Sequence, residues 1–61
     1  MITSNDIGKQ FFDTGFGRIV TLKALDMIGP VSMANVYDPD APNPGSRAYW
    51  VRTYNLSAVQ G

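Results

Sequence analysis

Residues 17–25 read GRIVTLKAL and carry the clearest secondary-structure signal in this 61-residue chain. The stretch alternates between two faces, with Val20, Leu22 and Ala24 on one and Ile19, Thr21, Lys23 and Leu25 on the other. Successive side chains of a β-strand point to opposite faces, and β-branched residues favour strands. We therefore predict a β-strand over residues 17–25.

A second strand is predicted directly after this one. Residues 26–30, DMIGP, contain Gly and Pro, which interrupt a strand, so the chain is expected to reverse there. Residues 31–37, VSMANVY, then form the second arm of a hairpin. Its buried face stays open, because one face carries Val31, Met33 and Tyr37 and the other carries Ser32, Ala34 and Val36.

A stiff loop separates the hairpin from a third predicted strand. Residues 38–46, DPDAPNPGS, hold three prolines and cannot be the interior of a strand or helix. Residues 47–54, RAYWVRTY, alternate again, with Tyr49, Val51 and Thr53 on one face and Ala48, Trp50, Arg52 and Tyr54 on the other.

Both ends of the chain are predicted to form short helical turns. Residues 3–6 offer several helix caps, and Ile7 and Phe11 lie four positions apart, which favours a short helix ending near Gly15. The alternative is a short strand over residues 9–12 followed by a Gly-rich turn. At the other end, residues 55–59 predict one helical turn that Asn55 caps, with Leu56 and Val59 facing inward.

The composition supports a mainly β fold in one domain, residues 1–61. Strong helix formers are scarce, Glu is absent and aromatic residues make up 11% of the chain. Three strands, a short N-terminal segment and a closing turn suit a small antiparallel β-barrel, in which closure removes exposed sheet edges. A hairpin, a long loop and a strand ending in a tight turn resemble the SH3-like barrels of Tudor and KOW domains. The alternative is an open antiparallel sheet packed against an N-terminal helix.

That resemblance is limited to the fold. No residue motif identifies a family, and no functional residue is transferred from one. The chain also lacks an acidic cluster like that in the peptide-binding loop of signalling SH3 domains, and it shows no four-aromatic cage.

Charge and composition argue against several functions. Five Lys and Arg residues balance five Asp residues, so the net charge is zero and strong binding to nucleic acid is disfavoured. His, Cys and Glu are absent, which removes the usual general bases, the thiol nucleophile and the commonest zinc ligands. We expect no enzyme, no cofactor and no bound metal.

The location of the protein is predicted from the absence of a membrane span and of a signal peptide in the sequence. No apolar run approaches the length of a membrane span, and residues 1–10 do not have the pattern of a signal peptide. A cytoplasmic or virion location is therefore expected, with no membrane partner.

The third strand carries the best candidate for a binding surface. Trp50, Arg52 and Tyr54 share one face, and these residue types dominate the energetics of protein interfaces. In the alternative reading, Trp50 is the core tryptophan of a small barrel and Tyr49 and Val51 face outward.

Three more residues are candidates for the same surface. Phe16 lies between two glycines in a turn, where it either seals the end of a barrel or inserts into a partner. The stiff loop adds Pro42 and Pro44. Two weaker motifs have simpler explanations: Asp38 and Asp40 are typical of solvated turns rather than a cation site, and Gly15 to Arg18 is typical of a plain turn rather than a phosphate loop.

These features predict a non-catalytic interaction or assembly module that docks on a larger protein or on copies of itself. A short chain of this kind is also typical of phage products, so a virion accessory protein of the head, neck or tail is a more specific hypothesis. The alternative is a small domain that binds nucleic acid or inhibits a host protein.

Overall fold

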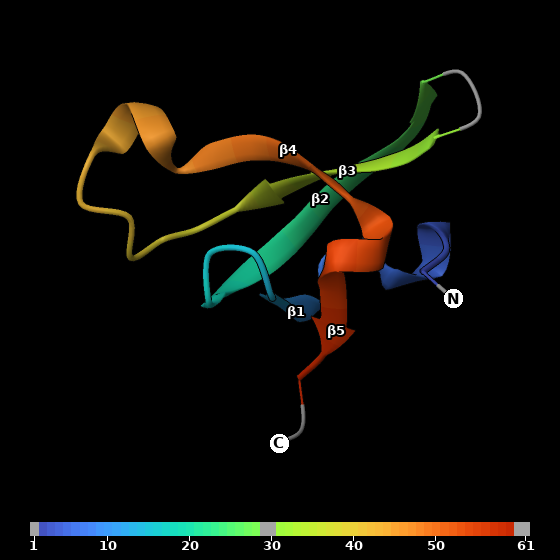
Figure 1. The fold of residues 1–61 in the computed structure, drawn as a ribbon, viewed down its shortest axis with the longest axis horizontal. Helices are drawn as coiled ribbons and strands as arrows, with labels where there is room; N and C mark the ends of the chain where they lie inside the picture. The colour runs from blue at the N-terminus through green and yellow to red at the C-terminus, as the bar shows by residue number, and fades with distance from the viewer. Residues whose placement is uncertain (1, 29–30, 60–61) are drawn as a thin grey trace.

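The computed structural model describes residues 2–28 and 31–59 and confirms the mainly β prediction. Its strands form one antiparallel five-stranded sheet in the order β4-β3-β2-β1-β5. The strands are β1 (Gln10–Asp13), β2 (Arg18–Ile28), β3 (Val31–Tyr37), β4 (Ala48–Arg52) and β5 (Leu56–Ala58). Figure 1 shows the sheet curling so that β5 returns beside β1, with the loop before β4 extending to one side.

The sheet is not closed into a barrel. Within the described part of the chain, β4 and β5 stand at opposite ends of the strand order and do not pair with each other. The helical segments of that part are the 3-10 turns η1 (Ser4–Asp6), η2 (Pro44–Ser46) and η3 (Thr53–Asn55). None of these turns is long or apolar enough to cross a membrane.

The N-terminal segment corrects the prediction of a helix reaching Gly15. A capping box holds η1, because Thr3 and Asp6 each bond the other's backbone N–H, and the turn then ends at Ile7. Gly8 has a φ of +96°, which a helix does not allow. Strand β1 follows, as in the alternative reading, since pairing with β2 on one side and β5 on the other satisfies its backbone.

Strand β2 continues past the predicted end at Leu25 as far as Ile28. Val20 and Leu22 are fully buried, as the alternation indicates. The register with β3 shifts between Leu22 and Ala24, which marks a β-bulge, and beyond it Leu25 packs against the core. The prediction that Leu25 lies on the same face as Ile19 is therefore wrong.

The hairpin between β2 and β3 is confirmed by pairing between Ile28 and Val31. The predicted reversal at residues 29–30 itself lies outside the described residues. In β3 the open question about its faces is answered, since Ala34 and Val36 are buried.

The C-terminal prediction is corrected as well. The helical turn η3 comes earlier than residues 55–59, and Arg52 precedes it at the N-cap without a side-chain cap. Leu56 is buried, but it begins β5, in which it pairs with Asp13 rather than lying in a helical turn. Val59 follows β5 and is exposed. The register with β1 explains the strand, because pairing with a neighbour satisfies backbone groups that an isolated turn leaves open.

The core is small and lies on the concave face of the sheet. Its buried hydrophobic members are Phe11, Val20, Leu22, Ala34, Val36 and Leu56, with Ile2, Leu25, Tyr49 and Val51 packed around them. Asp13 and Asp38 are also buried, with 1% and 2% of their surface exposed. Burial of two carboxylates in so small a core requires that each be hydrogen-bonded, and both lie at the same end of the molecule.

Candidate functional site

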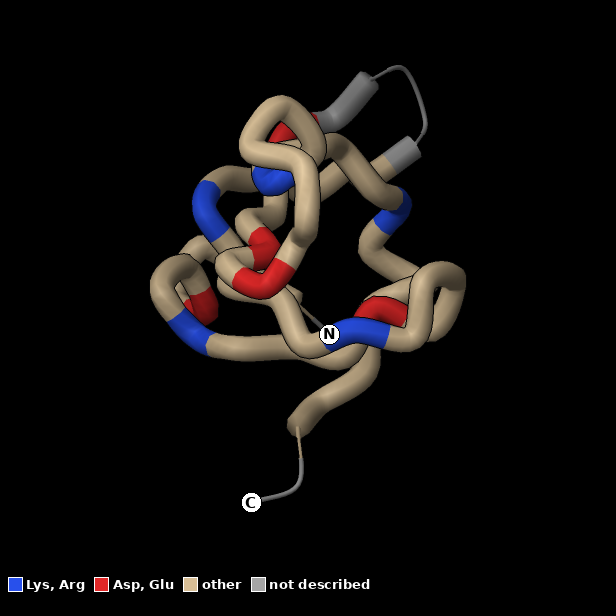
Figure 2. Tube along the Cα trace, turned by 90° about the vertical axis from the view of Figure 1, so that its left-hand side faces the viewer, with Lys and Arg blue, Asp and Glu red and all other residues tan. Residues whose placement is uncertain are grey.

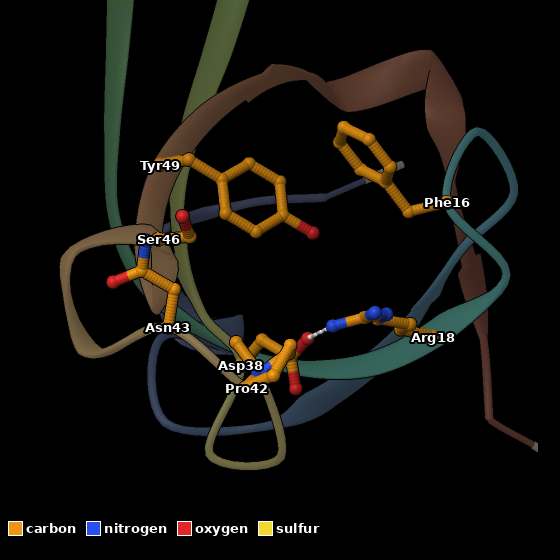
Figure 3. Close-up of a pocket in the computed structure, with 8 residues that line it drawn as sticks. Phe16, Arg18, Asp38, Pro42, Asn43, Ser46 and Tyr49 are labelled. Atoms are coloured by element: carbon orange, nitrogen blue, oxygen red, sulfur yellow. Dashed lines mark hydrogen bonds and ion pairs between the residues drawn. The ribbon is translucent and has the colours of Figure 1, made fainter.

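A pocket of about 310 Å³ opens beside these two carboxylates. Its lining comes from the β1–β2 turn, the start of β2, the Pro-rich loop and β4: Phe16, Arg18, Asp38, Ala41, Pro42, Asn43, Ser46 and Tyr49. Figure 3 shows Phe16 and Tyr49 on one side of the opening and the Arg18–Asp38 pair on the other. The pocket therefore combines an aromatic wall with a charged one.

Asp13 organises the turn that carries Phe16. One oxygen of its carboxylate accepts hydrogen bonds from the backbone N–H groups of Gly15 and Phe16, at 2.9 and 3.4 Å. Gly17, with a φ of +70°, donates its N–H to the Asp13 carbonyl at 2.7 Å. The backbone amides that a phosphate loop needs are thus already bonded within the chain, which favours the plain-turn reading of residues 15–18.

Tyr49 joins this turn to β4. Its hydroxyl donates to the second carboxylate oxygen of Asp13 at 2.7 Å. Burial, followed by this hydrogen bond to an anion, raises the pKa of Tyr49 above its ordinary value, so the phenol stays protonated. The Tyr49 ring also meets Phe16 edge-on, with centroids 5.5 Å apart and planes at 84°, which is a favoured aromatic geometry.

Asp38 and Arg18 form the charged wall. Arg18 donates to Asp38 at 2.8 Å, and the Asp40 backbone N–H donates to the other carboxylate oxygen at 3.0 Å. The Arg18 guanidinium is the main cause that lowers the pKa of Asp38, and the same hydrogen bond raises the pKa of Arg18. Asp38 is therefore a buried partner of β2 rather than a solvated turn residue, which corrects the sequence interpretation.

The opposite face of β4 carries Trp50. Its side chain is 49% exposed, whereas Tyr49 and Val51 pack against the core. The reading that makes Trp50 the core tryptophan is therefore wrong, and alternation along β4 is the physical reason.

Arg52 and Tyr54 form a contact next to Trp50 in the chain. The Arg52 guanidinium donates to the Tyr54 hydroxyl at 3.0 Å and lies 5.8 Å from the centre of its ring. Tyr54 is 72% exposed, and it belongs to η3 rather than to β4. Only Trp50 and Arg52 therefore share the outer face of the strand as the sequence predicts.

The six predicted interface residues fall into separate places. Phe16 and Pro42 line the pocket, on the concave side of the sheet. Trp50 and Arg52 lie on the convex face, with Tyr54 beside Arg52. Pro44 begins η2, is exposed and does not line the pocket.

Sequence reasoning named Phe16 and Pro42 but missed the polar residues in and behind the pocket wall. Asp13, Asp38 and Tyr49 were not proposed as a group, although Asp13 and Tyr49 are bonded across 36 positions of sequence. The local sequence held one indirect signal. An Asp that follows a strand and precedes a Gly-rich turn, as Asp13 does, often accepts hydrogen bonds from the backbone of that turn.

The described residues contain no cluster of three or more Asp, Glu, His or Cys side chains with the spacing of a metal site. Asp38 and Asp40 are not arranged as a cation site, since both carboxylate oxygens of Asp38 already accept hydrogen bonds, one from Arg18 and one from the Asp40 backbone N–H.

No protein-family model, curated protein or solved structure matches the chain.

Proposed function

We propose that this protein is a non-catalytic interaction module that docks on another protein chain through the outer face of β4. The observation that carries the proposal is the exposure of Trp50, at 49%, on a strand at the end of the sheet. Trp, Tyr and Arg supply most hot spots of protein interfaces, and Trp50 lies beside Arg52 and Tyr54.

The neighbours of Trp50 support this assignment. Arg52 is already held by Tyr54, so less side-chain entropy is lost when a partner orders it. Strand β4 is fixed to the rest of the sheet, because Tyr49 and Val51 pack against the core. A fixed strand with an aromatic and a guanidinium group on its outer face is suited to recognising a protein surface.

Charge supports a protein partner over nucleic acid. Figure 2 shows Lys and Arg positions interspersed with Asp positions along the trace, and the net charge is zero. Such a surface repels neither copies of itself nor most proteins, and it offers no broad positive face to phosphates.

The proposal includes two finer statements. The first is that the fold is a variant of the SH3-like barrel that is left open between β4 and β5; the return of β5 to β1 after a 3-10 turn supports it. The partner is a larger protein or a second copy of the chain, and phage head, neck and tail proteins are among the larger proteins to be tested.

A matched pair of substitutions tests the function. Trp50→Ala removes the exposed indole of β4, and Ile19→Ala removes a side chain of similar exposure, 47%, on the same convex face. Affinity-tagged wild-type and variant proteins are incubated with extract of the native source and compared by quantitative mass spectrometry and reciprocal capture. Proteins lost with Trp50→Ala and retained with Ile19→Ala support the proposal. Equal capture by both variants, or enrichment of nucleic acid alone, contradicts it.

A further inference from the structure

The outer edge of β4 is available for pairing. In the β3–β4 register, the Asp38 N–H donates to the Arg47 carbonyl, so residues 38 and 47 form a hydrogen-bonded pair. Such pairs alternate along an antiparallel ladder. The backbone groups of Ala48, Trp50 and Arg52 therefore point away from β3, towards the side of β4 where the described residues place no strand.

This edge lacks most of the features that usually protect one, and its one charged residue, Arg52, stands at its end. Residues 48–52, AYWVR, contain no Pro, no Gly and no Lys, and Tyr, Trp and Val strongly favour strands. The bulge of the sheet lies in β2 and not in β4. An unprotected edge of high strand propensity is a template for another strand.

The strand is also complementary to itself. If two copies of β4 pair antiparallel about Trp50, the two Trp50 residues face each other and Ala48 faces Arg52. No charged residue then faces another charged residue, and the small Ala48 leaves room for Arg52 to reach the Trp50 ring of the second copy diagonally. On the inner face, Tyr49 is opposite Val51.

We propose that two copies of this chain associate by antiparallel pairing of their β4 edges about a two-fold axis at Trp50. This inference rests on the proposed function, because it names a second copy as the partner of the β4 surface. Centring the pairing on Trp50 gives hydrogen-bonded pairs at Trp50 with Trp50 and at Ala48 with Arg52. In the second pair the Arg52 N–H is the free donor, because the N-cap carbonyl of Arg52 already accepts the first bond of η3. The zero net charge of the chain adds no repulsion between copies.

The geometry of the β4 pairing determines the stoichiometry and the affinity that we expect for the association. A two-fold interface uses the same strand twice and closes at a dimer. Pairing of β4 with the other sheet edge, the three-residue β5, would be shorter and would leave ends free for further growth. Because five-residue strands bury less than the roughly 1,200 Å² of a standard interface, we expect a weak dimer with a Kd at or above about 1 μM.

Arg52 allows a specific test of the backbone pairing. Its φ is −70° and ψ is 139°, values that proline adopts, and its N–H does not belong to the ladder with β3. Arg52→Pro therefore removes an N–H of the proposed interface while leaving the fold intact. Arg52→Ala removes the same guanidinium but keeps the N–H, and it is the matched control.

Sedimentation equilibrium from about 10 μM to about 1 mM measures the association. We expect the mass of the wild type to rise from 6.7 kDa towards twice that value, and Arg52→Pro to raise Kd about tenfold more than Arg52→Ala does. Circular dichroism and the urea midpoint verify that both variants are folded. If Arg52→Pro does not fold, Trp50→Thr replaces it and has to weaken the dimer by a similar factor.

Isotope-filtered NMR of a mixed labelled sample locates the contact. We expect a nuclear Overhauser effect between the Tyr49 Hα and the Val51 Hα of the second copy, because this pair is not hydrogen-bonded and its backbones approach closely. Contacts at the Phe16 pocket instead, or growth beyond a dimer, overturn the inference. A monomer at all concentrations also overturns it, but leaves the proposed function standing if Trp50→Ala still loses a protein partner.

Discussion

Tyr49 and Asp13 connect β4 to the β1–β2 turn through a hydrogen bond inside the molecule. Tyr49→Phe leaves one oxygen of the buried Asp13 carboxylate without its donor. An unsatisfied buried acceptor costs about 1–3 kcal/mol, so we expect the free energy of unfolding to fall by that amount. Urea denaturation measures it. Tyr54→Phe, which removes an exposed hydroxyl, is expected to change stability by less than about 0.5 kcal/mol, and equal losses in the two variants would contradict this role for Asp13.

Asp38 makes the stability of the protein depend on pH. Its pKa in the folded chain is lowered, mainly by the Arg18 guanidinium, from an ordinary value of 3.8. A carboxyl group with a lowered folded pKa stabilises the fold above its unfolded pKa, and this stabilisation is lost as pH falls through the folded pKa. We expect Asp38→Asn to be less stable than wild type at neutral pH and to lose less stability on acidification below about pH 4.

Denaturation with urea at a series of pH values measures this difference. A residual decline in stability is expected in Asp38→Asn, because the pKa of Asp6 is also lowered, first by the Thr3 backbone N–H and then by Lys9. Asp40→Asn is the control, since its exposed side chain is not the one that Arg18 binds. If the free energy of unfolding depended on pH in the same way in wild type and Asp38→Asn, the Asp38–Arg18 pair would contribute nothing to the pH dependence of stability.

These buried carboxylates mark the limit of what could be predicted about single residues. The exposure of Trp50 was one of two alternatives that alternation left open, and Phe16 was predicted to lie at a turn. Asp13 and Asp38 accept hydrogen bonds from neighbouring turn amides, but each also needs a donor 36 or 20 positions away, which the local sequence does not indicate.

At the level of the strands, local patterns located β2, β3 and β4, gave β1 only as the alternative to a helix, and missed the bulge and β5. Period-two alternation is strong in long strands and carries little information in β1 and β5, which have four and three residues. One inserted residue reverses the two faces beyond it, so an uninterrupted reading of residues 17–25 puts Leu25 on the wrong side.

The bulge predicts that Ile19 and Leu25 contribute differently to stability. Leu25 packs against the core, whereas Ile19 is 47% exposed. We expect Leu25→Ala to lower the free energy of unfolding by about 1–2 kcal/mol and Ile19→Ala by less than about 0.5 kcal/mol. Equilibrium denaturation of both variants measures the contrast. Similar losses would mean that alternation continues unbroken through Lys23.

At the scale of the whole molecule, composition predicted the mainly β class, but the sequence did not show whether the sheet closes into a barrel or stays open. Closure depends on whether β4 and β5 meet, and this is set by curvature accumulated over every strand pair rather than by any local motif. The Gly- and Pro-containing turns nevertheless brought Phe16, Pro42 and Tyr49 to the same pocket, and no single strand pattern indicated that arrangement.

The interspersed charges of the whole molecule yield the final prediction. Lys9 is paired with Asp6 and Arg18 with Asp38, which lowers the number of cations that are free to meet a phosphate backbone. A protein that neutralises several phosphates loses affinity steeply as salt rises. We expect fluorescence anisotropy with labelled single-stranded DNA and RNA to show no saturable binding at about 50 mM salt. Tight binding that falls steeply with salt and is lost in Trp50→Ala would instead identify the β4 face as a base-stacking surface, because aromatic side chains stack on nucleic-acid bases.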